Sequence, residues 1–217
     1  MIKDEIIEAV SNLDEDLVLN LVSQAVADGL TRKEIIRYVI LGMNEIGILY
    51  ESLDYYIADL IMAGCVFKSV LNFFDDLKQT GSSLTATERT GRILIGTVEN
   101  DIHDIGKSIF TNLALTEGYE VIDLGVDVKP HRFFEEALAT KPDILAMSGI
   151  ISNAIKSMTE TVNLFKKNYI RNDFKIIIGG LSLSEDLLNY IGADFATKSA
   201  ETGITKCNEW MREKNGQ

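Results

Sequence analysis

Cysteine and histidine are scarce in this sequence of 217 residues, which limits the metal chemistry open to it. The two cysteines, Cys65 and Cys207, lie far apart and lack the spacing of a thiolate pair. We therefore expect neither a disulfide framework nor a cysteine metal site, and we expect both thiols to be reduced. Only His103 and His131 can supply an imidazole, so a histidine-dependent site has just two candidates.

Positive charge is also in short supply. Residues 1–90 hold 7 Lys and Arg against 15 Asp and Glu, a net −8, and residues 91–217 hold 14 against 18, a net −4. Duplex DNA and anionic lipid both require a basic face, so we expect no nucleic-acid partner and no membrane partner. No apolar run approaches the ~20 residues of a membrane span. The opening residues, MIKDEIIEAV, lack the apolar segment of a secretory signal, which predicts a cytoplasmic location.

Proline is absent from the first 76 residues, and no alternating strand pattern occurs there. Apolar residues at helical spacing predict two short helices around 6–10 and 17–26, then longer ones behind Thr31 and over 55–74. Thr31 and Glu34 have the spacing of a capping box. We predict a four-helix bundle over 1–77, followed by a linker over 78–91 that is rich in Ser, Thr and Gly.

From residue 92 onward, short β-rich runs alternate with helical stretches. The expected strands are 93–98, 120–124, 144–148, 175–178 and 194–197, and the expected helices are 105–116, 130–138, 154–165, 185–190 and 200–213. Ser182 and Glu185 have capping-box spacing before the fourth of these helices. This alternation is typical of an α/β domain with a doubly wound, parallel, five-stranded sheet, Rossmann-like or flavodoxin-like, over 92–217.

In such sheets ligands bind beyond the carboxyl ends of the strands. The loop after the first expected strand contains Asp101, His103 and Gly106. A carboxylate two residues from a histidine can fix the imidazole tautomer while the other ring nitrogen binds a metal. On these residues alone, a solvated turn in which Asp104 caps the next helix is the favoured interpretation.

Small residues follow two further strands at regular distances. Residues 107–147, 41 in number, precede Ser148-Gly149-Ile150, and residues 151–178, 28 in number, precede Gly179-Gly180. Side chains this small would leave a slot between sheet and helices for a long, flat group. A glycine pair that merely turns the chain is the alternative.

Taken together, Asp101-x-His103-x-x-Gly106, Ser148-x-Ile150 and Gly179-Gly180 at these distances resemble the cobalamin-binding signature. The strings HDIGKSIF (103–110) and GYEVIDLGVDV (118–128) also resemble that family, and residues 43–64 resemble its helical cap domain. The resemblance is to the corrinoid proteins of anaerobic methyltransferase and O-demethylase systems, which are related to the cobalamin module of methionine synthase.

The resemblance implies cobalamin bound base-off and His-on, with His103 as the axial cobalt ligand and Asp101 orienting it. The displaced nucleotide tail would fill the slot, and Tyr50 and Ile57 of the cap domain would shield the methyl group. The implied cofactor-binding residues are Asp101, Ile102, His103, Asp104, Ile105, Gly106, Ser148, Gly149, Ile150, Ser152, Gly179 and Gly180.

The implied function is that of a methyl carrier that passes through a methylcobalamin form, not of an enzyme complete by itself. A substrate-specific methyltransferase would load it from an aryl methyl ether, a methylamine or methanol. An acceptor methyltransferase would unload it onto tetrahydrofolate or a thiol, and a reductive activator is a further implied partner. The 78–92 segment would act as a hinge for the cap domain.

The sequence departs from the family pattern at three positions. Asn100 stands where these proteins often have glycine, and Ile150 replaces leucine. Ala154 stands where methionine synthase has a hydroxyl that completes a His-Asp-Ser relay, so the relay ends at Asp101 unless Ser152 substitutes.

Two other functional classes fit parts of the sequence. A cobalamin-dependent sensor would share the layout, but we expect no DNA-binding domain here, and the only tryptophan, Trp210, lies outside the cap. A phospho-receiver domain would use acidic residues such as Glu99 and Asp101, yet it would not account for Ser148 and the Gly179-Gly180 pair.

Overall fold

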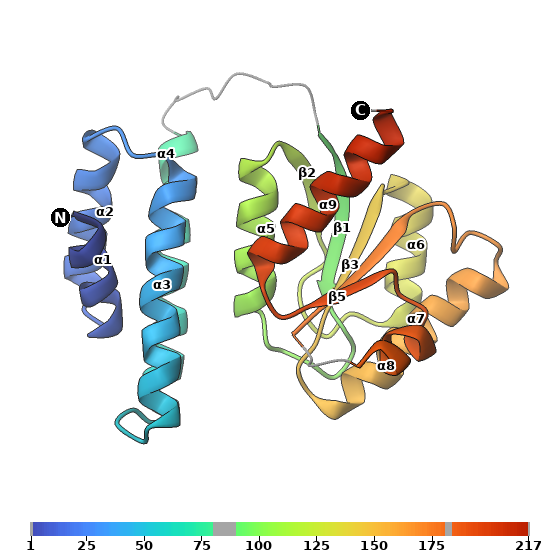
Figure 1. Cartoon of the computed structure of the whole chain (residues 1–217), viewed down its shortest axis with the longest axis horizontal. Helices are drawn as coiled ribbons and strands as arrows, with labels where there is room; N and C mark the ends of the chain where they lie inside the picture. The colour runs from blue at the N-terminus through green and yellow to red at the C-terminus, as the bar shows by residue number, and fades with distance from the viewer. Residues whose placement is uncertain (1, 80–89, 181–183, 217) are drawn as a thin grey trace. The chain divides into compact units, whose positions relative to one another are not determined.

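The structure is a computed structural model that describes residues 2–79, 90–180 and 184–216 (Figure 1). The chain divides into two compact units, Met1–Thr85 and Ala86–Gln217. Helix α4 continues through Gln79, two residues into the predicted linker, and most of that linker lies outside the described residues. The exact limits of the predicted domains and the predicted hinge stay predictions.

The first unit contains the four predicted helices. They are α1 (Ile2–Ser11), α2 (Glu15–Ala27), α3 (Arg32–Glu51) and α4 (Ile57–Gln79). The capping box before α3 is present: the Glu34 N–H donates to Thr31 Oγ1 over 3.3 Å, and the Thr31 N–H donates to Glu34 Oε2 over 2.8 Å. The start of α3 is therefore marked, as the sequence predicted, by side chains that satisfy its free amides.

Apolar residues at helical spacing form the core of this unit. Ile6, Val22, Ile36, Val39 and Phe67 are completely buried, one or two from each helix. Helices α1 and α3 approach very closely, because a Cβ on Gly42 of α3 would lie 2.6 Å from Val10 Cβ. Glycine at this position sets the distance between the two helices.

Helix α4 departs from the sequence-based expectation about apolar runs. Its segment Ile57–Phe74 spans 18 residues with a mean hydropathy of 1.6, long and apolar enough to cross a membrane, and 33% of it is buried. The expectation that no run comes near that length was therefore wrong. One such helix is weak evidence for a span, since the core helix of a globular unit passes the same test. Its exposed apolar side chains include Ile57 (67% exposed) and Ile61 (64%).

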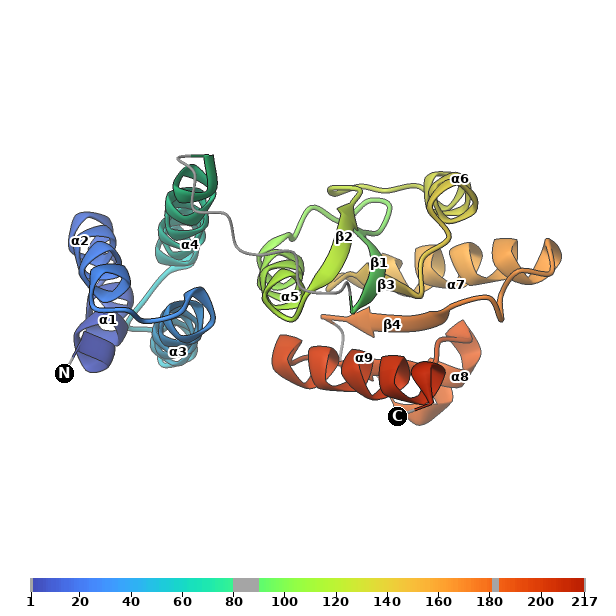
Figure 2. The ribbon, with the colours of Figure 1, turned by 90° about the horizontal axis from the view of Figure 1, so that it is seen from above.

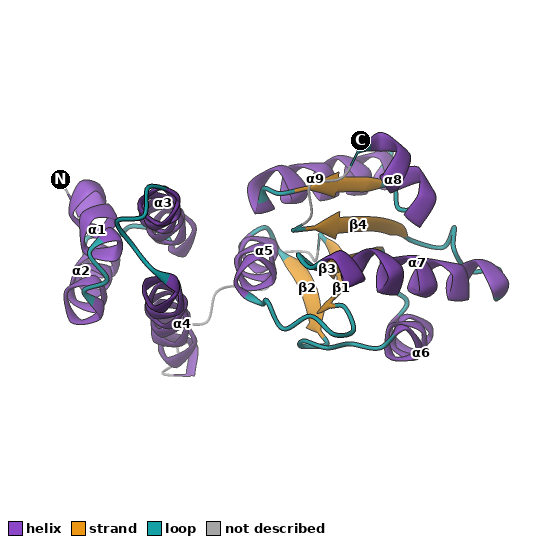
Figure 3. Ribbon diagram, turned by 90° about the horizontal axis from the view of Figure 1, so that it is seen from below, coloured by secondary structure: helices purple, strands orange, loops and turns teal. Residues whose placement is uncertain are grey.

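The second unit is built on five strands, all parallel. They are β1 (Gly91–Thr97), β2 (Tyr119–Asp123), β3 (Ile144–Ser148), β4 (Lys175–Gly179) and β5 (Phe195–Thr197), in the order β2-β1-β3-β4-β5. Figures 2 and 3 show the sheet between its layers of helices. The predicted doubly wound, five-stranded α/β fold is confirmed.

Helices cover both faces of this sheet. They are α5 (Ile105–Thr116), α6 (Pro130–Thr140), α7 (Ser152–Lys167), α8 (Glu185–Ile191) and α9 (Ala200–Asn215). Ile93 and Ile95 of β1 pack with α5 and α9, while Leu94 between them packs with α6 and α7. Because successive strand residues point to opposite faces, an uninterrupted apolar strand serves both cores.

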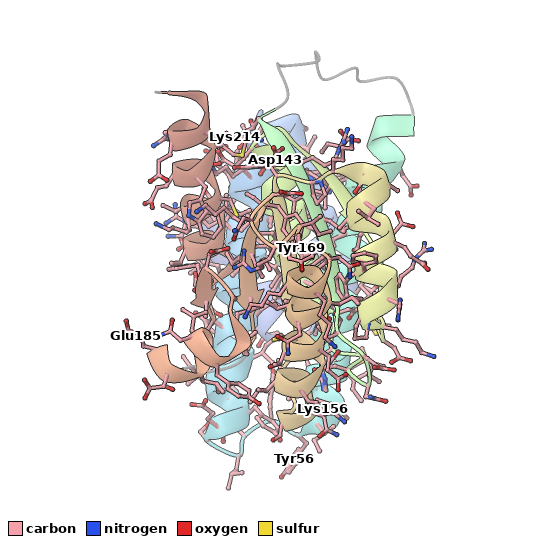
Figure 4. The ribbon with its side chains drawn as sticks, turned by 90° about the vertical axis from the view of Figure 1, so that its right-hand side faces the viewer. Tyr56, Asp143, Lys156, Tyr169, Glu185 and Lys214 are labelled. Atoms are coloured by element: carbon pink, nitrogen blue, oxygen red, sulfur yellow. The ribbon has the colours of Figure 1, made fainter. Side chains whose placement is uncertain are left out.

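The amino ends of the strands form one edge of the sheet, and the carboxyl ends form the other. At the amino edge Lys214 of α9 pairs with Asp143 just before β3, with Nζ and Oδ1 2.5 Å apart (Figure 4). The loops that contain the predicted site residues follow β1, β3 and β4, so they all lie at the carboxyl edge.

Candidate cobalamin site at the carboxyl edge of the sheet

His103 lies in the loop between β1 and α5, and its side chain is 54% exposed. The last residue of β1 anchors the loop: the Thr97 hydroxyl, completely buried, donates to the His103 carbonyl oxygen over 3.2 Å. Asp104 follows at the N-cap position of α5, but it does not make the side-chain capping bond expected of it. The loop thus presents the imidazole to solvent from a fixed backbone.

Asp101 is buried, with 1% of its surface exposed, and both of its carboxylate oxygens accept hydrogen bonds. Oδ1 lies 2.7 Å from His103 Nδ1 and accepts the His103 N–H over 3.0 Å. Burial raises the pKa of Asp101, but the hydrogen bonds from His103, Ile150 and Ile151 outweigh it, so the pKa lies below its ordinary value. The carboxylate is therefore ionised at neutral pH, and His103 Nδ1–H donates to it.

The other oxygen of Asp101 is bound by the loop after β3. Oδ2 accepts the Ile150 N–H over 2.7 Å and the Ile151 N–H over 3.3 Å, immediately before α7 begins at Ser152. A carboxylate at a helix N-terminus is favourable, because free amides and the helix dipole both stabilise negative charge there. Backbone amides, and not a hydroxyl group, thus bind the Asp101 oxygen at which a His-Asp-Ser relay would continue. Ser152, the candidate for that hydroxyl, is exposed, and Ala154 is buried.

Asn100 has a left-handed backbone, with φ of 66°. Glycine adopts this conformation most readily, and asparagine is among the few other residues that tolerate it. The departure from the family pattern at this position therefore keeps the loop conformation. The Asn100 N–H also donates to Asp127 Oδ1 over 2.7 Å, which ties the loop to the segment after β2.

Sequence reasoning missed that segment after β2, residues 124–128. It runs beside the His103 loop: the Asp127 N–H donates to the Asp101 carbonyl over 3.0 Å, and Val98 and Val128 form a parallel bridge. The signal was available in the string GYEVIDLGVDV, because β2 neighbours β1 and their following loops must lie side by side.

Exposed apolar side chains occur on the three segments that these hydrogen bonds join. Ile102 is 72% exposed, Val126 40% and Ile150 47%. A Cβ on Gly106 would have no other atom within 4 Å, so open space adjoins the first turn of α5. Exposed apolar groups on the segments joined to the His103 loop, with open space beside α5, fit a large, flat, mostly apolar ligand.

The two glycine clusters lie together, as predicted, but closely packed. Ser148 pairs with Gly179 across β3 and β4, and the Gly149 N–H donates to the Gly179 carbonyl over 3.1 Å. A Cβ on Gly149 would lie 2.5 Å from Ala154 Cβ, and one on Gly180 would lie 2.6 Å from the Gly149 oxygen. Neighbouring protein atoms fill the room these glycines were expected to leave, and residues 181–183 are outside the described part of the chain. The slot stays a prediction.

The described part of the chain holds no metal centre made only of protein side chains. Within residues 2–79, 90–180 and 184–216, no three His, Cys, Asp or Glu side chains are grouped to hold an ion. A single exposed imidazole suits a metal whose remaining ligands come from a macrocycle.

A pocket of about 620 Å³ lies at the opposite, amino edge of the sheet, between Asp143 and Trp210 among others. Two ion pairs lie in its lining, Arg171 with Asp194 over 2.9 Å and Lys214 with Asp143 over 2.5 Å. The pocket and the His103 loop lie at opposite ends of the strands, so we assign the pocket no part in the site.

Comparison with known proteins identifies the ligand. The family of B12 binding domains matches residues 91–204, and a second family of B12 binding domains matches residues 2–73. Dimethylamine corrinoid protein 1 of Methanosarcina acetivorans is 32% identical over 216 residues, which cover 97% of this chain and 100% of that protein.

Among the solved structures that are similar to this chain, two match it over nearly its whole length. A cobalamin-binding protein from Desulfitobacterium hafniense is 33% identical, with a TM-score of 0.58, and covers 96% of this chain and 98% of its own. The monomethylamine corrinoid protein of Methanosarcina barkeri is 24% identical, with a TM-score of 0.78 and coverages of 96% and 97%, and shows the same fold. The chain therefore belongs to the B12-binding family, as a corrinoid protein whose cofactor is cobalamin.

Proposed function

We propose that this protein carries a methyl group on cobalamin, with His103 as the axial cobalt ligand in the base-off/His-on state. The observation that carries the proposal is the Asp101–His103 pair: Nδ1 is held 2.7 Å from a buried carboxylate, while more than half of the imidazole is exposed. This leaves Nε2 as the nitrogen that binds the metal.

When bound, cobalamin supplies a cobalt atom that takes up a methyl group and gives it to an acceptor. The protein supplies the imidazole and controls its basicity. Asp101 accepts the Nδ1 proton, fixes the tautomer and makes Nε2 a better donor to the metal. Because four hydrogen bonds hold Asp101, the ring keeps its orientation whether or not Nε2 is engaged.

The nucleotide tail, in this proposal, inserts past Ser148, Gly149, Gly179 and Gly180. Since atoms of Val98, Ala154 and the loop after β3 lie against Gly149 and Gly180, this space must open when the tail enters. The remaining predicted contacts lie in the loops after β1 and β3 and in the first turns of α5 and α7: Ile102, Asp104, Ile105, Gly106, Ile150 and Ser152. The shielding role of Tyr50 and Ile57 stays a prediction.

We propose a methylated amine as the methyl donor, reached through a substrate-specific methyltransferase. The support is the similarity, over 97% of the chain, to a protein named for dimethylamine. A second methyltransferase would then move the methyl group to tetrahydrofolate or a thiol. The test mixes the cobalamin-bound, unmethylated protein with methyltransferases for methylamines, methanol and aryl methyl ethers. The corrinoid absorbance shows which enzyme methylates it. Methylation by the methanol or aryl ether enzyme alone would contradict it.

Two single variants test His103 as the ligand. We expect His103→Ala to bind some cobalamin but to lose the absorption spectrum of histidine-ligated cobalt, because no imidazole remains in the loop. His131→Ala is the matched control: it removes the other histidine, an exposed residue of α6, and should leave the spectrum unchanged. A wild-type spectrum in His103→Ala would contradict the proposal.

A further inference from the structure

Lys107 is a buried charged residue that the proposed function does not use. It lies in the first turn of α5, and its side chain is only 5% exposed. Its ammonium group pairs with the carboxylate of Asp123, the last residue of β2, which is 35% exposed. Taking a lysine out of water costs free energy, so an apolar residue would serve stability at this position as well or better. The ion pair therefore calls for a reason other than stability.

Hydrogen bonds lead from this ion pair to the backbone of His103. The second carboxylate oxygen of Asp123 accepts the Gly125 N–H over 2.9 Å, and Gly125 has a left-handed φ of 87°. The Gly125 carbonyl accepts the Thr97 N–H over 2.9 Å, and the buried Thr97 hydroxyl donates to the His103 carbonyl. Every step joins neighbouring groups within hydrogen-bond distance.

A second set of contacts joins the same two segments further along. The Val128 N–H donates to the Thr97 carbonyl over 2.9 Å, and the Asp127 N–H donates to the Asp101 carbonyl over 3.0 Å. The Asp127 side chain accepts the Asn100 N–H, which supports the left-handed turn just before Asp101. Hydrogen bonds thus hold residues 124–128 alongside residues 97–101. The Lys107–Asp123 ion pair fixes the end of this segment that is nearest β2.

We propose that Lys107 is a positioning residue for His103, acting through Asp123 and residues 124–128. Its charge holds Asp123, Asp123 orients Gly125, and the segment after β2 then fixes the loop that presents the imidazole. Lys107 does not touch the cofactor in this account. The inference rests on the proposed function for its consequence, which is tighter binding of cobalamin through His103.

The experiment compares Lys107→Met with a control variant in the full-length protein. Methionine keeps the length and apolar character of the side chain and removes its charge. Arg171→Met is the matched control, since Arg171 is 14% exposed and pairs with Asp194 at the amino edge of the sheet. Asp123→Asn is the second variant if Lys107→Met fails to fold: it removes the carboxylate charge that holds Lys107, while its amide oxygen can still accept the Gly125 N–H.

Two readouts are measured, one without cofactor. In the cobalamin-free protein we expect faster amide hydrogen exchange over residues 97–103 in Lys107→Met, and not in Arg171→Met. In the presence of cobalamin, we expect Lys107→Met to bind about 10-fold more weakly, with a smaller histidine-ligated fraction in the spectrum. A structural role alone would change thermal stability in both variants and leave the ligated fraction unchanged.

The outcomes distinguish a failure of the Lys107 positioning role from a failure of the proposed function. Unchanged exchange over 97–103 together with a wild-type ligated fraction in Lys107→Met would overturn the positioning role. If the wild-type protein itself shows no histidine-ligated cobalt, the proposed function fails, and the exchange data alone decide whether Lys107 holds the loop.

Discussion

At the scale of single residues, the buried Asp101 carboxylate joins two loops that are far apart in sequence. One oxygen binds His103 and the other binds the amides of Ile150 and Ile151. A change at Asp101 therefore disturbs the imidazole and the start of α7 together. Asparagine would place an amide donor against N–H groups, at a cost on the order of 1–3 kcal/mol.

The Asp101–His103 pairing could be predicted from the sequence, because the two residues are two positions apart in one loop. The Asp101 contacts to Ile150 and Ile151 could not, since they depend on how closely the loops after β1 and β3 approach. The same limit applies to Gly149 and Gly180. Their spacing along the chain predicts a shared edge, whereas the 2.5 Å and 2.6 Å clashes of added Cβ atoms depend on packing.

Gly106 offers a test in which stability and binding change in opposite directions. An added Cβ meets nothing within 4 Å, and the residue lies in the first turn of α5, so Gly106→Ala should stabilise the cobalamin-free protein by about 0.5 kcal/mol. If the open space belongs to the cofactor, the added methyl should weaken cobalamin binding by roughly 10-fold. Denaturant unfolding and absorbance titration measure the two effects. Unchanged affinity would place the cofactor away from Gly106.

At the scale of elements, periodicity located every strand and helix of the second unit to within about two residues. Element ends were predicted well where a side chain marks them, as Thr31 and Glu34 do for α3. The predicted start of α8 at residue 185 is confirmed, but its N-cap is Ser184, which accepts the Leu187 N–H over 3.3 Å, whereas Ser182 of the predicted capping box lies outside the described residues. Ser182 and Ser184 lie two positions apart, so either could be the N-cap, and spacing alone could not choose between them.

The packing of α9 on the sheet has a measurable consequence at alkaline pH. Cys207 of α9 is completely buried, and burial raises the pKa of its thiol to about 12. In the unfolded chain the thiol ionises near pH 8.5, so above that pH the unfolded state binds fewer protons than the native state. Stability should therefore fall as pH rises from about 8.5 toward 12, and Cys207→Ala should flatten that decline.

Thiol labelling checks the same arrangement directly. In the native protein at mildly alkaline pH, a thiol reagent should modify the exposed Cys65 of α4 and spare Cys207 until denaturant is added. Equal labelling of both thiols in the native protein would mean that α9 does not cover the sheet as described.

At the scale of the whole molecule, strand order explains why the site lies where it does. In the order β2-β1-β3-β4-β5, the chain leaves β1 toward β2 and later returns to build outward from β3. The loops after β1 and β3 diverge at this switch, and ligands of doubly wound sheets bind there. The Asp101 contacts to Ile150 and Ile151 cross this switch point. The strand order therefore places His103 beside the point where the loops after β1 and β3 diverge.

The central claim, that His103 binds the cobalt of cobalamin, is tested most directly by electron paramagnetic resonance of the protein loaded with cobalamin and reduced to cobalt(II). The protein is produced with ¹⁵N-labelled histidine, while the cofactor keeps ¹⁴N in its nucleotide base. An axial nitrogen from His103 should then split each cobalt line into a doublet, because ¹⁵N has spin one half. Triplets, which ¹⁴N in the cofactor's own base produces, would contradict the account.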